Sequence, residues 1–399
     1  MSPPIYLDHN ATSPLIPQAR EAMSRALADS ESRWGNASSP HAFGHAARLA
    51  VEDARIEVAH LIGAEPREVI FVSGGTEADN LAIQGAARAM SEAGRGAGRV
   101  VTSAIEHPAV LGCCRRLQSD GWSLAILPVD GDGAVEQDEA WRALTGGAAL
   151  VSVMAANNET GVLQPFETIA RMAREAGSTI HVDAVQAAGR IPIDVKRADI
   201  DLLSLSSHKL GGPPGIGALY AREGVALAPL ILGGGQERKR RAGTEAPILA
   251  AGFAAAARAA RERAGDGASR IRDLRDRMES GLIARIEGAR VNGAAAERLP
   301  NTTSLTIPGA DNEALVIAMD LLGFALSTGS ACSTGSSRPS HVLAAMGLST
   351  AEAVSTIRIS LGPATTRAEI DALVEALAGA LIGARRAPSG GIATVRGGR

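Results

Sequence analysis

The chain has 399 residues, which is long enough for two domains and a large core. A net charge of −3, with 21% charged residues, gives no electrostatic reason to expect nucleic acid or an anionic membrane as a partner. No apolar stretch reaches the ~20 residues of a membrane helix, and three cysteines, two of them adjacent, make no disulfide framework. We therefore expect a cytoplasmic protein.

Strand-like and helix-like stretches alternate between about residues 69 and 220. Two stretches with helical periodicity, 76–94 and 166–177, lie between apolar runs that predict strands. The predicted strands cover 69–75, 99–107, 123–130, 149–158, 179–184 and 201–209. This alternation indicates an α/β fold with a mainly parallel sheet that binds ligands at the carboxyl ends of its strands.

The character of the chain changes after residue 245. An Ala-rich helix is predicted over 248–264 and a charged helix over 270–286, followed by short strands and two further helices. These elements indicate a smaller α+β domain. We predict a large cofactor-binding domain over 15–260, a small domain over 1–14 and 261–384 that carries Cys332, and a disordered Gly/Arg/Pro-rich tail over 385–399.

Lys209 and Asp183 each lie at the end of a predicted strand. Lys209 follows the apolar run 202–205 at the entry to a Gly/Pro loop, and Asp183 ends the strand 179–184. Pyridoxal phosphate needs such a pair, because a lysine holds it as a Schiff base and a buried aspartate keeps its pyridine nitrogen protonated. The alternative is a lysine that caps a strand and pairs with a carboxylate.

Several polar groups near these residues could hold a phosphate. Gly75 and Thr76 stand between a strand and a helix, where N–H groups and a hydroxyl form a phosphate site. The alternative is a strand-to-helix turn with Thr76 as its N-cap. Ser206 and His208 flank Lys209 and could reach the same phosphate, although His208 could equally be a hydrogen-bonded core histidine.

Three more polar residues lie at the same predicted edge. Gln186, three residues after Asp183, could reach the phenolic oxygen of the ring. Asn158 ends another strand, where asparagine either binds a ligand or forms a turn. His107 lies between a strand end and a helix, and its imidazole could stack on the ring and move protons near neutral pH.

The three cysteines differ in their surroundings. Cys332 lies in 327–340, a run almost wholly of Ser, Thr, Gly and Ala, which predicts an exposed and mobile thiol. An incidental surface cysteine is the alternative. Cys113 and Cys114 lie in an apolar helical stretch and are predicted to be core residues.

Arg358 alternates with apolar residues along a strand. It is therefore either paired structurally or faces a pocket where it grips a carboxylate bidentately. Arg241 and Thr244 follow a glycine triplet and form either a second anion site or a solvated basic loop.

The chain resembles the cysteine desulfurases, which are pyridoxal phosphate enzymes of the class V aminotransferase fold. The resemblance covers about residues 5–380. It rests on motifs in unbroken order: YLDHNATSP, WGNASSPHAFG, SGGTEADN, EHPAV, NNETG, HVDAVQ, SSHKLGGPPGIG, GGGQERKRRAGTE, GSACSTGSSRPS and IRISLG. The long Ser-rich cysteine segment resembles the group that serves iron–sulfur assembly or nitrogenase maturation.

The resemblance implies a homodimer that removes sulfur from L-cysteine and releases L-alanine. It implies that Lys209 holds the cofactor and removes the α-proton, and that Cys332 takes the sulfur as a persulfide. The other implied contacts are the phosphate with Gly75, Thr76, Ser206, His208 and Thr244 of the neighbouring subunit, the ring with Asp183, Gln186, Asn158 and His107, and the substrate carboxylate with Asn36 and Arg358.

The persulfide is expected to pass to a sulfur acceptor or an iron–sulfur scaffold protein, and Cys332 could be a transient iron–sulfur ligand shared with such a partner. The C-terminal tail does not resemble the acceptor-docking tail of the housekeeping members. Two alternatives stay open: a selenocysteine lyase or other class V enzyme, and a non-catalytic sulfur-carrier or scaffold protein.

Overall fold

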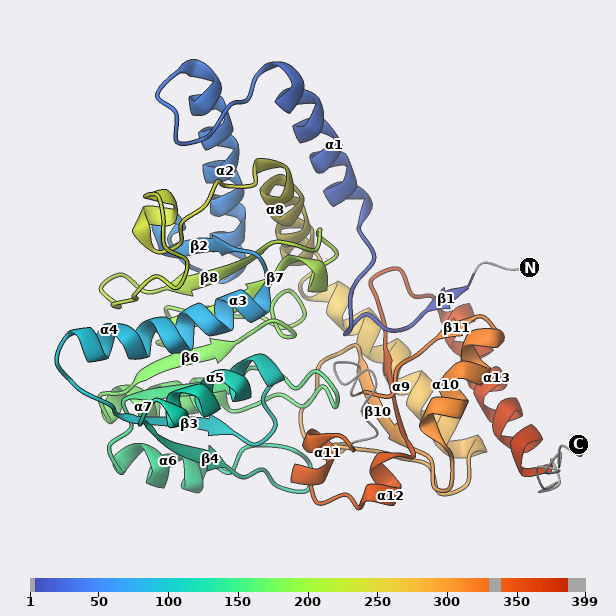
Figure 1. Cartoon of the computed structure of the whole chain (residues 1–399). Coiled ribbons are helices and arrows are strands. Elements are labelled where there is room, and N and C mark those ends of the chain that lie inside the picture. Colours follow the sequence, from blue (N-terminus) through green and yellow to red (C-terminus); the bar gives the residue numbers. More distant parts are fainter. Residues whose placement is uncertain (1–3, 330–338, 387–399) are drawn as a thin grey trace, which may run out of the picture.

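A computed structural model describes residues 4–329 and 339–386 of the chain (Figure 1). Its main sheet has the strand order β2-β8-β7-β6-β5-β3-β4. The strands are β2 (Val69–Val72), β3 (Arg99–Ser103), β4 (Ser123–Leu127), β5 (Leu150–Met154), β6 (Thr179–Asp183), β7 (Leu202–Ser206) and β8 (Gly217–Ala221). Six of these strands run in one direction, and β8 runs antiparallel to them. The prediction of a mainly parallel sheet is therefore confirmed.

Strand β8 is the element of this sheet that the sequence analysis missed. It begins at Gly217, directly after a Gly/Pro-rich stretch that reads as loop. A Cβ at Gly217 would lie 2.6 Å from the carbonyl oxygen of Leu205 and 2.7 Å from the backbone of Gly74. The glycine is required for this close approach, so a residue typical of loops starts a central strand.

Helices cover both faces of the sheet, because its apolar side chains alternate in direction. One face packs against α3 (Gly75–Asn80), a π-helical turn (Leu81–Gly85), α4 (Ala86–Glu92) and α5 (Pro108–Ser119). The other face packs against α2 (Ala42–Leu61), α6 (Gln137–Thr145), α7 (Phe166–Glu175) and α8 (Pro247–Glu262). The predicted helices 76–94, 166–177 and 248–264 are among them.

A second hydrophobic cluster joins the N-terminal segment to the C-terminal part of the chain. Leu7 packs there, and β1 (Ile5–Tyr6) pairs in parallel with β11 (Phe324–Ala325). The other elements of this part are α9 (Asp266–Arg285), the antiparallel strands β9 (Arg290–Val291), β10 (Thr302–Thr306) and β12 (Thr356–Ser360), and helices α10 (Asn312–Leu321) and α13 (Arg367–Arg386).

The short helices α11 (His341–Ala345) and α12 (Thr350–Ala353) pack into the first cluster through Val342, Leu343, Met346 and Ala353. The division into a large and a small domain stays a prediction. The tail prediction falls largely on residues 387–399, which lie outside the described residues.

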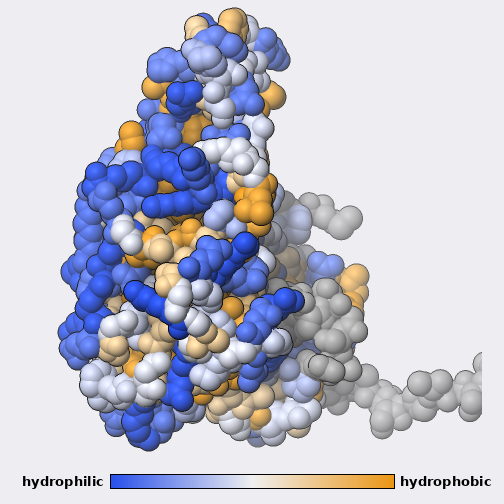
Figure 2. All heavy atoms as spheres, turned by 60° about the vertical axis from the view of Figure 1, so that its left-hand side comes forward, coloured by the Kyte–Doolittle hydropathy of each residue, from blue (hydrophilic) through white to orange (hydrophobic). Residues whose placement is uncertain are grey.

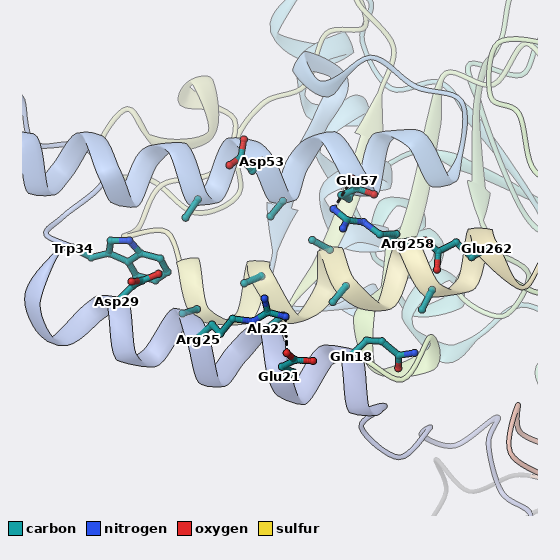
Figure 3. A pocket seen from close by; sticks show the side chains of 17 residues that line it. Gln18, Glu21, Ala22, Arg25, Asp29, Trp34, Asp53, Glu57, Arg258 and Glu262 are labelled. Atoms are coloured by element: carbon teal, nitrogen blue, oxygen red, sulfur yellow. Dashed lines mark hydrogen bonds and ion pairs between the residues drawn. The ribbon is translucent and has the colours of Figure 1, made fainter.

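The face shown in Figure 2 is mainly hydrophilic, with scattered apolar residues, as is usual for protein surfaces. A groove with an alanine floor lies between α1 (Pro17–Ser32), α2 and α8 (Figure 3), and no predicted site residue lines it. In the described part of the chain, no helix combines the length and apolar character that crossing a bilayer requires.

Candidate active site

Six strands of the main sheet end at one edge, because β2, β3, β4, β5, β6 and β7 run in the same direction. The segments that follow them carry most of the predicted cofactor residues: Gly75, Thr76, His107, Asn158, Asp183, Gln186, Ser206, His208 and Lys209. This is the edge where open α/β sheets bind ligands.

Lys209 lies against the N-terminal segment of the chain. It ends the 3₁₀ turn Ser207–Lys209, and its Nζ donates to the carbonyl oxygens of Asn10 at 2.6 Å and Ala11 at 2.7 Å. The neighbouring His208 has its Nδ1 3.1 Å from Thr12 Oγ1. Burial lowers the pKa of His208 to about 4, so this imidazole is neutral near pH 7.

Both polar atoms of the Gln186 side-chain amide form hydrogen bonds. Its Nε2 donates to the carbonyl oxygen of Asn10 at 2.9 Å, and its Oε1 accepts a short hydrogen bond from Arg190. Arg190 also donates to the carbonyl oxygens of Gln186 and His9. The sequence analysis did not identify Arg190, since nothing in its motif distinguishes it from a surface arginine.

Asp183 is a buried carboxylate at the end of β6, and its Oδ1 accepts from the backbone N–H of Val185 at 2.9 Å. Burial raises its pKa, while the Val185 N–H and the nearby side chains of His107 and Lys209 oppose that rise. A buried carboxylate of this kind is stabilised by a cationic partner, so Asp183 suits a protonated ring nitrogen.

His107 is the N-cap of α5 and accepts from the backbone N–H of Ala109 at Nδ1. Burial lowers its pKa, so the ring is neutral near pH 7. Because Nδ1 is an acceptor, the proton of the neutral ring is assigned to Nε2.

Two further acids lie buried near Asp183. Glu106 Oε1 accepts from Ser103 Oγ at 2.5 Å and from the N–H of Met154 at 2.9 Å, while its Oε2 has no partner among the described residues. Burial raises the pKa of Glu106 to about 8. The pKa of Asp79, in α3, is raised first by burial and then by the negative charge of Asp183. Glu106 therefore favours the protonated form near pH 7, and the pKa of Asp79 is shifted in the same direction.

His181 connects three strands beneath this edge. On β6, its Nδ1 lies 2.8 Å from Ser152 Oγ of β5 and its Nε2 lies 2.9 Å from Ser204 Oγ of β7. Burial lowers its pKa to about 3, so the ring is neutral and its hydrogen-bonding capacity is used within the sheet. The sequence analysis read HVDAVQ only for Asp183 and Gln186.

The start of α3 comes close to Ser206. A Cβ at Gly75 would lie 2.8 Å from Val185 Cγ2 and 3.6 Å from Ser206 Cβ. Thr76 is exposed at this turn, whereas Ser206 is buried at the end of β7. The structure therefore brings the first N–H groups of α3 next to Ser206, as an anion site requires.

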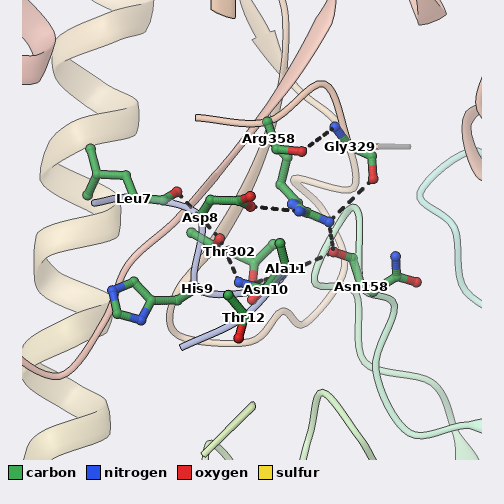
Figure 4. A network of polar contacts seen from close by, with 12 residues as sticks. Leu7, Asp8, His9, Asn10, Ala11, Thr12, Asn158, Thr302, Gly329 and Arg358 are labelled. Atoms are coloured by element: carbon green, nitrogen blue, oxygen red, sulfur yellow. Dashed lines mark hydrogen bonds and ion pairs between the residues drawn. The ribbon is translucent and has the colours of Figure 1, made fainter. Parts of the chain in front are cut away.

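Arg358 is buried on β12 and is the centre of a polar network (Figure 4). Its Nη2 lies 2.7 Å from Asp8 Oδ1, and its Nη1 donates to the carbonyl oxygens of Asn158 at 3.1 Å and Gly329 at 3.3 Å. Asn10 Nδ2 donates to the same carbonyl oxygen of Asn158 at 3.1 Å. Asn10 and Asn158 thus connect Lys209 to Arg358.

Thr244 and Asn36 lie apart from the hydrogen-bonded network around Lys209 and Arg358 in the described part of the chain. Thr244 is exposed, on the segment after the 3₁₀ turn Gln236–Lys239. Asn36 is exposed beyond α1, whose 16 residues span ~24 Å from its start near Ser13. Its Oδ1 accepts from the N–H of Ser38.

The segment with Thr244 is fastened to the sheet by a buried ion pair. Glu237 accepts from Arg55 at 2.6 and 3.0 Å and from the N–H of Phe71 on β2 at 3.0 Å. Arg55 also donates to the carbonyl oxygen of Val69. Arg241 donates to Glu77 at 2.9 Å, so in the described structure its guanidinium forms an ion pair with this carboxylate.

Cys332 lies outside the described residues, so its predicted role is carried forward as a prediction. Cys113 and Cys114 are buried, as predicted. Burial raises the pKa of the Cys113 thiol to about 11 and that of Cys114 to about 12, which keeps both protonated near pH 7.

The N-terminal segment is the part of the site that sequence reasoning missed. Residues 8–13 contact Arg358, Asn158, Gln186, His208 and Lys209. The available signal was the polar run DHNATS directly after the strand-like IYL, which resembles the polar strand ends that were recognised elsewhere.

Comparison with known proteins places these features in one family. The class-V aminotransferase family matches residues 5–373. A cysteine desulfurase of Trichormus azollae is 44% identical over 94% of this chain and 92% of its own length. An IscS-like cysteine desulfurase of Mycobacterium tuberculosis is 43% identical over 96% of this chain and 97% of its own. A solved NifS-like protein has a TM-score of 0.87 at 34% identity and covers 95% of this chain and 99% of its own.

Proposed function

The chain belongs to the class-V aminotransferase family and is a cysteine desulfurase, and from this premise we propose which residues carry the reaction. The observation that carries the proposal is the connection of Lys209 to Arg358 through Asn10 and Asn158. An amine that holds a cofactor and a guanidinium that grips a carboxylate are thereby kept within one polar network.

The described residues fit pyridoxal phosphate. The N-terminal turn of α3 at Gly75 and Thr76, together with Ser206 and His208, would hold the phosphate. Asp183 would pair with the ring nitrogen, because a buried carboxylate whose pKa is raised by desolvation is stabilised by a cation. Gln186 and Asn158 would lie on the ring-oxygen side, and His107 would stack on the ring.

When bound, pyridoxal phosphate supplies the electron sink that makes loss of the α-proton of L-cysteine possible. Arg358 holds the α-carboxylate, and Lys209 moves the α-proton. The carbonyl oxygens of Asn10 and Ala11 keep the lysine amine within reach of that proton. His107, neutral near pH 7, assists by moving a second proton.

Cys332 takes the sulfur. As a thiolate it attacks the substrate sulfur, so that an S–S bond forms while the Cβ–S bond breaks. The electron pair of the broken bond stays with the substrate carbon, which is protonated and leaves as L-alanine. The raised pKa values of Cys113 and Cys114 support this assignment, because neither buried thiol is a nucleophile near pH 7.

The active form is a homodimer, and Thr244 and Asn36 serve the partner subunit's site. Their exposure, and the distance of Asn36 from Arg358 within one chain, support this arrangement. The persulfide passes to a sulfur acceptor such as an iron–sulfur scaffold protein in the cytoplasm. Cys332 is a transient iron–sulfur ligand there.

The test is incubation with L-cysteine carrying radiolabelled sulfur. We expect the wild type to release alanine and to keep label after desalting. Cys332→Ser should still bind cofactor and cysteine but form almost no alanine and keep no label, because a hydroxyl is too weak a nucleophile. Cys113→Ser is the matched control and should behave as the wild type.

Alanine formation by Cys332→Ser at near wild-type rate would contradict the proposed sulfur transfer. A selenocysteine lyase would then describe the protein better, since selenium can leave without a catalytic thiol.

A further inference from the structure

The buried guanidinium of Arg358 has an incomplete set of partners among the described residues. Of its five N–H groups, the two on Nη1 are used by the carbonyl oxygens of Asn158 and Gly329, and one on Nη2 is used by Asp8. In the described part of the chain, Nε has no partner although it is buried. Nε and the remaining N–H of Nη2 belong to one edge of the guanidinium, where a carboxylate can bind in bidentate fashion.

The backbone fixes Asp8 next to Arg358. Asp8 forms a parallel bridge with Ser360, two residues after Arg358 on β12. Around this bridge, the N–H of Ser360 donates to Leu7 at 2.8 Å, and the N–H of Asn10 donates to Ser360 Oγ at 2.9 Å. The strand that carries the guanidinium therefore also holds the residue that contacts it (Figure 4).

We propose that Asp8 is a positioning residue for the substrate: its carboxylate fixes the guanidinium of Arg358 so that the Nε edge stays available to the α-carboxylate of L-cysteine. This inference rests on the proposed function. Asp8 does not touch the substrate, and it acts through the orientation of Arg358.

Orientation matters here because the other partners of Arg358 constrain it on one side only. Both carbonyl contacts are made by Nη1, and without Asp8 nothing among the described residues holds Nη2. A guanidinium that can turn about its Nη1 contacts presents its free edge to the substrate for part of the time. Loss of Asp8 should therefore weaken carboxylate binding without changing the chemistry of the bound substrate.

The experiment compares two inhibitors that differ in the carboxylate alone, L-alanine and ethylamine. Inhibition constants against L-cysteine turnover are measured for the wild type, Asp8→Ala, Asp8→Asn, Arg358→Ala and the double variant. Thermal unfolding and bound-cofactor absorbance check that each variant is folded and loaded. Asp371→Ala, which removes a surface partner of Arg277, is the matched control.

For Asp8→Ala we expect the inhibition constant of L-alanine and the KM for L-cysteine to rise about tenfold, with kcat within about threefold of the wild type. Ethylamine should bind as before. Asp8→Asn should stay within about threefold of the wild type, because its amide oxygen still accepts from Nη2. In the Arg358→Ala background, Asp8→Ala should have no further effect.

The inference is overturned if Asp8→Ala binds L-alanine as the wild type does, or weakens ethylamine equally, or adds its full effect to Arg358→Ala. Should Asp8→Ala not fold, Asp8→Ser loses the same contact and gives the same comparison. If the wild type forms no alanine from L-cysteine, the proposed function itself fails, and that outcome is separate from all of these.

Discussion

The two halves of the proposed active site are assembled in different ways. The cofactor half consists of the residues that follow β2, β3, β5, β6 and β7, so neighbouring parallel strands bring them to one edge. The substrate half consists of Arg358 and its partners Asp8, Asn158 and Gly329, which join segments up to 350 residues apart. A sheet edge supplies the first half, whereas specific long-range hydrogen bonds supply the second.

The N-terminal segment connects these halves. Asn10 accepts from Lys209 and Gln186 with its carbonyl oxygen and donates to the carbonyl oxygen of Asn158 with its side chain. Asn10, which does not follow a strand of the main sheet, thus couples the cofactor half to the substrate half. We therefore expect a substitution in the substrate half to leave the cofactor half largely intact. A substitution in the network around Asn10 should disturb both halves.

The largest expected effect comes from Lys209→Ala. Alanine formation should fall at least about a thousandfold, because no other described group can replace the amine. The desalted protein should lose the yellow colour of bound pyridoxal phosphate, and its thermal unfolding should stay close to that of the cofactor-free wild type. Absorbance and an alanine assay measure both. A yellow, active variant would remove Lys209 from the cofactor half.

The support beneath the cofactor half is tested by Glu237→Ala. It leaves Arg55 buried without its ion-pair partner, and we expect it to lower the free energy of unfolding by about 3–5 kcal/mol. Glu223→Ala breaks the exposed pair with Arg67, whose side chains are 68% and 63% exposed, and should cost less than about 1 kcal/mol. Denaturant unfolding compares the two variants. Equal losses in the free energy of unfolding would argue against a stabilising role for the buried ion pair of Glu237 and Arg55.

The smallest expected effect is a pH-dependent change in stability from Glu106→Gln. The folded protein keeps the proton of Glu106 up to about pH 8, whereas the unfolded chain releases it above its ordinary pKa of 4.5. The contribution of Glu106 to the free energy of unfolding therefore falls as pH rises from 4.5 to about 8. Glutamine does not titrate, so the variant shows no such fall. The Tm of the variant relative to the wild type should rise by a few degrees from about pH 5 to about pH 8 and then level off. A Tm difference that does not change with pH would contradict a protonated Glu106.

Most of the cofactor half could be predicted from the sequence, for a physical reason. A buried parallel strand is an apolar run, and a polar residue at its end must face either solvent or a ligand. Asp183, Ser206 and Lys209 carry that signal, and the structure brings their segments to one edge. The glycine pair before Thr76 is interpretable for the same reason, since a strand-to-helix turn exposes N–H groups.

The rest could not be predicted because its cause lies in partners far along the chain. The position of the Asp8 carboxylate can be understood only from its contact with Arg358, which lies 350 positions later in the chain. Glu106 and Asp79 look like ordinary helix-start acids in the sequence, and only packing shows that they are buried. Gly217 resembles loop glycines, although it starts a central strand. The roles proposed for Asn36 and Thr244 depend on a second copy, and Cys332 lies outside the described residues.

His181 gives the protein an internal reporter. Its ring spans β5, β6 and β7 through two serine hydroxyls and has no exposed surface, so its one ring N–H is sheltered from water. Such a proton exchanges slowly and gives a separate downfield NMR signal, which depends on the spacing of the three strands that end at the active site. A change in that spacing could be followed in solution from one resonance, without any label on the catalytic residues.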